Sequence, residues 1–185
     1  MERIYRWQSI DGAGLEHLSL RRRDDVIVAD GIVIGGHDDP DGPFGCCYRI
    51  CCDAGWRVRS VEVHAAGGQS QVLTSDGGGS WRDGDGLVLA ELSGCIDVDI
   101  SATPFTNTLP IRRLGAGLRE RTDISVVYIP VPTLALRPMP QAYTRLGDGR
   151  YLYEGPFGGF AAALEVDEDG VVLHYPALFR RMEVT

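Results

Sequence analysis

Hydrophobic and polar residues alternate along most of this chain, in short segments. Residues 15–20, 96–101 and 122–131 are examples, with aliphatic or aromatic side chains recurring at every second position. A period of two is typical of β-strands with one buried face. Asp-Gly and Gly-Gly turns separate the segments at a spacing of roughly 8–12 residues. The pattern predicts an all-β, mainly antiparallel fold, with roughly a dozen or more short strands in a curved sheet or open barrel.

Local signals refine this prediction. Only residues 109–121 and 176–182 have a helical pattern, so we expect one or two short helices. Residues 26–34 read as a hairpin with its turn at Asp30-Gly31, and a shift of phase near Ser60 predicts a β-bulge. Residues 37–43 read as a polar turn. No repeat or linker divides the chain, so we expect a single β-barrel-like domain over residues 1–185.

The stretch from residue 94 to residue 114 departs from this simple pattern. Ile96, Val98 and Ile100 alternate with Asp97 and Asp99. A strand here would bury the aliphatic set and present the two carboxylates, roughly 7 Å apart, on its other face. The loop that follows is polar and proline-rich, yet it also contains aliphatic and aromatic side chains. We therefore expect this loop to pack onto the sheet and to form a site.

The charge balance excludes several classes of function. The formal net charge is −8, which disfavours nucleic acids and anionic membrane surfaces as partners. All 18 basic residues are arginines. Without lysine the chain has no P-loop, no Schiff base and no lysine general base.

The cysteines and the N-terminus indicate a compartment. Residues 44–52 read as a strand that carries four of the five cysteines, and neighbouring residues of a strand point to opposite faces. The outer pair would be roughly 20 Å apart, so we expect small buried hydrophobic residues rather than a metal site. Residues 1–8 contain no apolar h-region and no small-residue cleavage site, and no apolar run in the sequence approaches about 18 residues. We therefore expect a cytoplasmic protein with no transmembrane segment, no cofactor and no metal.

Two alternatives remain open for the aspartates of the central stretch. Carboxyl groups about 5–9 Å apart serve glycoside hydrolases as acid and base. Solvated aspartates paired with arginines would have the same pattern.

The adjacent Arg112 and Arg113 could bind an anionic head group, or they could lie at the surface beside a short helix. The chain has no serine-hydrolase motif.

The same stretch carries a family resemblance. Residues 94–100 read GCIDVDI and residues 103–114 read TPFTNTLPIRRL, a combination that resembles the hallmark of a bacterial family of glycolipid-binding proteins. Supporting matches lie at residues 48–50, 56–58, 127–132, 141–143 and 166–176, so the resemblance spans nearly the whole chain. It implies a curved half-barrel similar to those of lipoprotein carriers. Unlike those carriers, this chain is expected to have no signal peptide and no lipidated N-terminal cysteine.

Together these observations favour binding of a lipid, a glycolipid or another amphipathic small molecule in a cavity of a curved sheet. We expect a polar mouth between Asp97 and Arg113, and we expect no catalytic residue. The residues predicted to bind the ligand are Trp56, Arg57, Asp97, Asp99, Thr106, Asn107, Arg112 and Arg113. Two alternatives stay open: an enzyme acting on a sugar-containing small molecule through Asp97 and Asp99, and a structural or dimerisation module without a ligand.

Overall fold

The protein is built around one large curved β-sheet. The computed structural model describes residues 2–36, 42–156 and 159–183. Its sheet contains 14 strands in the order β7-β6-β5-β4-β3-β2-β1-β14-β13-β12-β11-β10-β9-β8. Because β7 and β8 form two edges, the sheet does not close into a barrel. The prediction of a mainly antiparallel curved sheet is therefore confirmed, in its open form.

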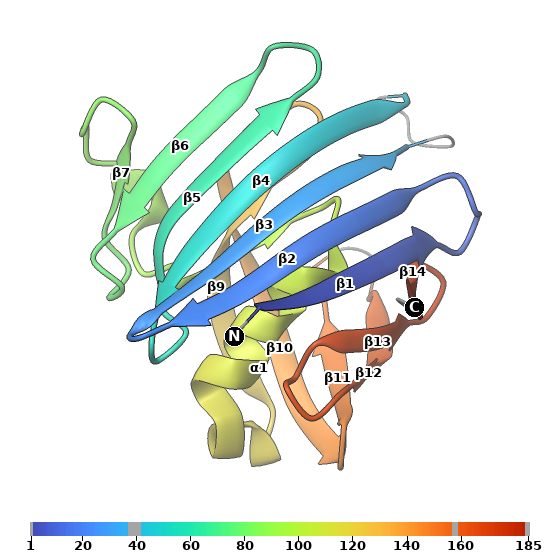
Figure 1. Cartoon of the computed structure of the whole chain (residues 1–185). Helices are drawn as coiled ribbons and strands as arrows, with labels where there is room; N and C mark the ends of the chain where they lie inside the picture. The colour runs from blue at the N-terminus through green and yellow to red at the C-terminus, as the bar shows by residue number, and fades with distance from the viewer. Residues whose placement is uncertain (1, 37–41, 157–158, 184–185) are drawn as a thin grey trace.

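The chain runs through the sheet as two meanders. The first consists of β1 (Glu2–Ser9), β2 (Leu15–Arg23), β3 (Val26–Gly35), β4 (Phe44–Asp53), β5 (Val58–Ala65), β6 (Ser70–Ser75) and β7 (Trp81–Asp83). The second consists of β9 (Thr122–Ile129), β10 (Arg137–Gly147), β11 (Arg150–Glu154), β12 (Ala161–Val166), β13 (Val172–Tyr175) and β14 (Phe179–Met182). Antiparallel pairing of β1 with β14 joins the two meanders, which Figure 1 shows as blue-to-green and orange-to-red halves.

A mostly helical segment, which also contains one short strand, connects the meanders across the concave side of the sheet; we call it the connecting segment. It consists of η1 (Ala90–Leu92), β8 (Asp97–Ile100), η2 (Pro104–Asn107), α1 (Thr108–Leu114) and η3 (Gly115–Arg119). Strand β8 pairs with β9 in parallel, whereas every other pairing between the described strands is antiparallel. A parallel pair requires a crossover connection, and η2, α1 and η3 supply it. The predicted helix near residues 109–121 thus corresponds to α1 and η3.

The core lies on both sides of this connecting segment. One hydrophobic cluster joins the inward face of the first meander to β8, η2 and β9, and includes Trp7, Ile100 and Leu109. A second cluster joins the inward face of the second meander to Ile111 and Leu118. The connecting segment therefore fills the bend of the sheet and contacts both halves.

The predicted hairpin at residues 26–34 is wrong. Residues Val26–Gly35 form one continuous strand, β3, with Asp30 and Gly31 in its middle. A Cβ atom added at Gly31 would lie 2.2 Å from two ring atoms of Tyr48 on the neighbouring strand. Glycine is present here because the Tyr48 ring crosses the backbone at this point, and not because the chain turns.

Other local predictions have mixed outcomes. The bulge near Ser60 is confirmed, since Cys51 pairs with Ser60 while Cys52 pairs with Val58, which leaves Arg59 as the extra residue. The helix expected at residues 176–182 is wrong, because Phe179–Met182 is strand β14. Most of the polar turn predicted at residues 37–43 lies outside the described residues. None of the helices in the described parts of the chain has the length and apolar character needed to span a membrane.

Replacing Gly31 tests the proposed packing role. We expect Gly31→Ala to lower the free energy of unfolding by about 1–3 kcal/mol, because the added methyl group overlaps the Tyr48 ring. Gly45→Ala, on the adjacent strand β4, is the matched control, since its Cβ would meet nothing closer than 3.6 Å. Urea denaturation of both variants measures the effect, and equal losses of stability would contradict this account.

Candidate functional site

The two aspartates of β8 lie on one face of the strand, as the alternation predicted, but that face is not presented to solvent. Asp97 is completely buried and Asp99 is half-buried. The cause is the segment that follows, because η2 and α1 fold back and pack against β8. The expectation of a solvent-facing carboxylate pair is therefore wrong.

Asp97 forms a buried ion pair with Arg113 of α1. The guanidinium donates two hydrogen bonds, one from Nε to Oδ1 at 3.0 Å and one from Nη2 to Oδ2 at 2.5 Å. Burial raises the pKa of Asp97, and the bonds and charge of Arg113 oppose that rise. This bidentate pair fixes α1 over β8, which leaves Asp97 poorly suited to act as an acid or base on a substrate.

Asp99 and Asn107 connect the same segment to the second meander. Gln141 of β10 donates to Oδ2 of Asp99 at 2.6 Å, and Thr106 donates to Oδ1 at 3.2 Å. Burial raises the pKa of Asp99, against the effect of these two bonds. Tyr143 of β10 donates to the side-chain oxygen of Asn107 at 2.8 Å. Thr106 and Asn107 are both buried, so their main contacts lie within the protein.

A third buried carboxyl group, Glu16, connects the segment to the first meander. Oε1 of Glu16 accepts hydrogen bonds from the hydroxyls of Tyr48 at 2.5 Å and Thr103 at 2.8 Å. Its other oxygen, Oε2, has no hydrogen-bond partner among the described residues. Only 3% of Glu16 is exposed, and this burial raises the pKa of the carboxyl group to about 8. Glu16 is therefore a neutral acid over much of the physiological pH range.

Sequence reasoning missed Glu16, although a signal was present. Glu16 occupies the same strand face as Leu18, which is buried. A carboxylate in the apolar phase of an alternating strand is costly to bury unless it has partners. That position marks Glu16 as unusual, but its partners Tyr48 and Thr103 are distant in sequence.

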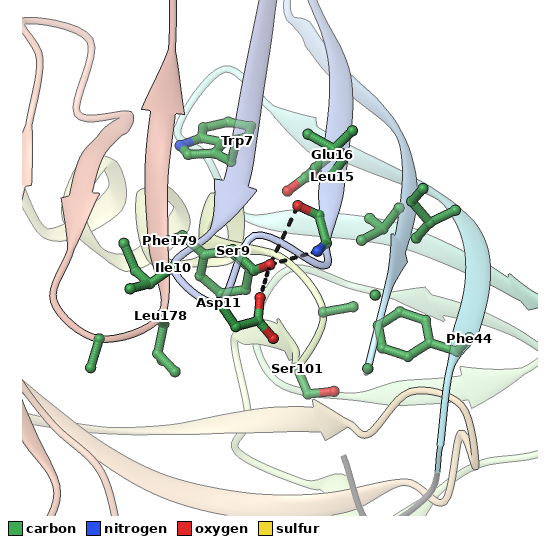
Figure 2. Close-up of a pocket in the computed structure, with 17 residues that line it drawn as sticks. Trp7, Ser9, Ile10, Asp11, Leu15, Glu16, Phe44, Ser101, Leu178 and Phe179 are labelled. Carbon is green, nitrogen blue, oxygen red and sulfur yellow. Dashed lines mark hydrogen bonds between the residues drawn. The ribbon is translucent and has the colours of Figure 1, made fainter. Parts of the chain in front are cut away.

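Glu16 borders a cleft at one end of strands β1 to β4, and we call it the Trp7 cleft. The cleft measures about 230 Å³. Its apolar walls include Trp7, Val33, Phe44, Ala102, Leu178 and Phe179. Its polar lining residues are Ser9, Asp11, Glu16 and Ser101. Figure 2 shows Trp7, Glu16 and Phe44 approaching the cleft from different strands, with Ser9 bonded to Asp11 and to the backbone of Gly14.

A smaller hollow adjoins the Trp7 cleft, and we call it the Asp99 hollow. It measures about 150 Å³ and shares Ser101, Leu178 and Phe179 with the Trp7 cleft. Its other lining residues are mostly polar or aromatic: Asp99, Thr103, Asn107, Tyr128, Met139, Tyr153 and Tyr175. Two of the residues predicted to bind a ligand, Asp99 and Asn107, thus lie beside the apolar cleft.

The remaining predicted residues lie elsewhere. Trp56 and Arg112 line a separate hollow, where the Arg112 guanidinium carbon is 5.4 Å from the centre of the Trp56 ring. Arg57 donates to the backbone oxygen of Gly77 at 2.7 Å. The structure therefore divides the predicted residues into the Asp97–Arg113 pair, the group of Asp99, Thr106 and Asn107, and the hollow of Trp56 and Arg112, with Arg57 bonded to Gly77. Within the described parts of the chain, no cluster of three or more His, Cys, Asp or Glu side chains is arranged to hold a metal ion.

Comparison with known proteins identifies relatives of this chain. The profile of a family described as "Putative glycolipid-binding" matches residues 4–181. A crystal structure of a DUF1089 family protein from Pseudomonas aeruginosa has 43% sequence identity and a TM-score of 0.81, and the match covers 92% of each chain. No protein with a curated function matches the chain. The resemblance seen in the sequence is therefore confirmed at the level of family and fold.

The buried acid predicts a specific dependence of stability on pH. A carboxyl group with a pKa of about 8 in the folded protein and near 4.5 when unfolded binds its proton more tightly in the folded state. Its contribution to stability is complete below pH 4.5 and is lost as the pH rises towards 8. We expect Glu16→Gln, which does not titrate, to become more stable relative to wild type over this window, by at most about 1.4 kcal/mol per pH unit.

Urea denaturation at pH 5, 6, 7 and 8 measures this difference. Asp30→Asn is a suitable control, because Asp30 lies on the outer face of the sheet and pairs with the exposed residues Arg21 and Arg49. Parallel stability profiles for Glu16→Gln and wild type would show that Glu16 does not carry a raised pKa.

Proposed function

This chain belongs to the "Putative glycolipid-binding" family, and from that membership we propose that it binds a lipid or glycolipid on the concave side of its sheet. The apolar part of the ligand occupies the Trp7 cleft. The sugar or other polar head occupies the adjoining Asp99 hollow. The structural observation that carries the proposal is Glu16, a buried carboxyl group that lines the apolar cleft and has one oxygen without a hydrogen-bond partner among the described residues.

The apolar lining of the Trp7 cleft is suited to binding an acyl or alkyl chain. Its apolar side chains come from five strands and from the turns beside them, including Phe44, Leu178 and Phe179. Burying apolar surface of this kind contributes about 25 cal/mol per Å² to binding before the costs of association. A small number of polar groups beside such walls is typical of sites for amphipathic ligands.

Glu16 supplies directional recognition within this apolar setting. Because Oε1 already accepts bonds from Tyr48 and Thr103, the acidic proton is placed best on Oε2. A ligand hydroxyl or ester oxygen near Oε2 would accept this proton in a hydrogen bond. Satisfying a buried polar group is worth about 1–3 kcal/mol relative to leaving it unpaired.

The Asp99 hollow suits a hydroxyl-rich head group. Asp99 and Asn107 line the hollow, and each Asp99 oxygen, which accepts one bond within the protein, keeps a further lone pair, while Tyr128, Tyr153 and Tyr175 add aromatic rings. Aromatic faces pack against the apolar face of sugars, and carboxylate oxygens accept bonds from sugar hydroxyls. Because the hollow and the cleft share three residues, one amphipathic molecule can reach both.

The test is to block the space that the two hollows share. Ser101 lines both, so we expect Ser101→Phe to occupy the junction and to reduce lipid binding at least about tenfold. Native mass spectrometry of protein incubated with a bacterial lipid extract measures bound lipid, and organic extraction identifies it. His64→Phe adds the same ring on the opposite face of the sheet, where His64 is exposed, and serves as control.

The expected result is a lipid-sized mass increase in wild type and in His64→Phe that is absent from Ser101→Phe. Circular dichroism confirms that each variant is folded. Equal lipid binding by folded Ser101→Phe and His64→Phe would place the ligand outside the Trp7 cleft. A wild-type protein that takes up no lipid would contradict the proposal altogether.

A further inference from the structure

The hollow that Trp56 and Arg112 line lies at the end of strands β1 and β2 opposite to the Trp7 cleft, and we call it the arginine hollow. It measures about 180 Å³. Its charged lining residues are Arg3, Arg22, Arg112 and Asp169, and Tyr5 and Trp56 form part of its wall. It shares no lining residue with the Trp7 cleft. It is therefore a separate site.

Two of these arginines occupy inward-facing strand positions. Arg3 lies two residues before Tyr5 on β1, and Tyr5 is buried on the concave face. Arg22 lies two residues after Leu20 on β2 and pairs in register with the buried Ile27 of β3. Inward positions of a sheet are normally apolar. Two guanidinium groups therefore lie at the rim of a face that is otherwise mostly apolar, and both line the same hollow.

The third arginine reaches the hollow from α1. Arg112 packs over the Trp56 ring, and a Cβ atom added at Gly170 would lie only 3.0 Å from Cδ of Arg112. Gly170 also has a φ angle of +76°, which favours glycine. The absence of a side chain at Gly170 therefore leaves the space that the stem of Arg112 uses to enter the hollow.

The hollow concentrates positive charge in an acidic protein. Three arginines and one carboxylate, Asp169, line it, whereas the chain as a whole has a formal net charge of −8. Arg3 forms an ion pair with Asp169. Local excess charge of this kind attracts anions, and guanidinium groups bind oxyanions through pairs of hydrogen bonds.

Tyr5 adds a hydrogen-bond donor to this set. The tyrosine is 93% buried, with 7% of its surface exposed, and its hydroxyl has no hydrogen-bond partner among the described residues. Burial raises the pKa of Tyr5, so the phenol keeps its proton at neutral pH. Apart from Asp169, the polar side chains of the described residues that line the hollow can all donate hydrogen bonds.

We propose that the arginine hollow binds a phosphate group, held by Arg3, Arg22 and Arg112 with Tyr5 as a further donor. The phosphate belongs either to a lipid head group or to a free phosphate ion. Trp56, Leu20 and Ile27 provide an apolar floor beside the charges, which suits a phosphate attached to a hydrocarbon group. The Tyr5 and Trp7 rings, stacked with centroids 5.9 Å apart, lie between this hollow and the Trp7 cleft.

The test compares two adjacent arginines of β2 that face opposite sides of the sheet. Arg22→Gln removes a charge inside the hollow, and Arg23→Gln removes the same charge from the outward face. Isothermal titration calorimetry with dihexanoyl phosphatidic acid, inorganic phosphate and uncharged dihexanoylglycerol measures binding to each variant. We expect Arg22→Gln to weaken binding of the phosphate ligand about tenfold or more, and Arg23→Gln to change it by less than about twofold.

The two sources of phosphate give different results. Much tighter binding of phosphatidic acid than of inorganic phosphate identifies a lipid head group, and similar affinities identify free phosphate. Equal losses in Arg22→Gln and Arg23→Gln would indicate unspecific attraction and overturn the proposal. Absence of binding at millimolar concentrations of both phosphate ligands would also overturn it. Because Ser101→Phe leaves the arginine hollow intact, phosphate binding by that variant distinguishes this site from the Trp7 cleft.

Discussion

The structure depends on the way in which the segment from β8 to α1 is held inside the curved sheet. Unpaired polar groups in such a position cost about 1–3 kcal/mol each, and among the buried polar side chains of this segment only the hydroxyl of Thr108 has no partner in the described residues. Thr103 bonds to Glu16 of the first meander, while Asp99 and Asn107 bond to Gln141 and Tyr143 of the second. The bidentate pair of Asp97 and Arg113 then fixes the helix over the strand. The Trp7 cleft and the Asp99 hollow lie beside this packed segment.

Alternation along the chain predicted the strands well because each side chain of a strand faces either the core or the outside. The same rule placed Asp97 and Asp99 on one face. Alternation does not reveal whether a later segment covers that face, and here η2 and α1 cover it. Asp30-Gly31 shows a related limit. The pair has the chemistry of a hairpin turn, but glycine also permits a neighbouring ring to cross a continuous strand, as Tyr48 does.

The candidate site was harder to predict from the sequence than the strands were, for a chemical reason. Threonine, asparagine and paired aspartate and arginine side chains can bind a polar head group, and the same side chains can fix a buried loop. Asp97, Thr106 and Arg113 mainly do the latter. Glu16 was missed because its partners lie 32 and 87 residues away along the chain. The family resemblance carried the functional expectation that local patterns alone did not provide.

The concave side of the sheet offers an apolar cleft whose floor includes the fully buried Trp7. Fluorescence quenching by a lipid with a brominated acyl chain is the most direct test, because bromine quenches only nearby indole rings. The chain has three tryptophans, and Trp56 and Trp81 do not line this cleft. The account predicts strong quenching in the wild type that largely disappears in Trp7→Phe. Bound brominated lipid with equal quenching in the two proteins would contradict it.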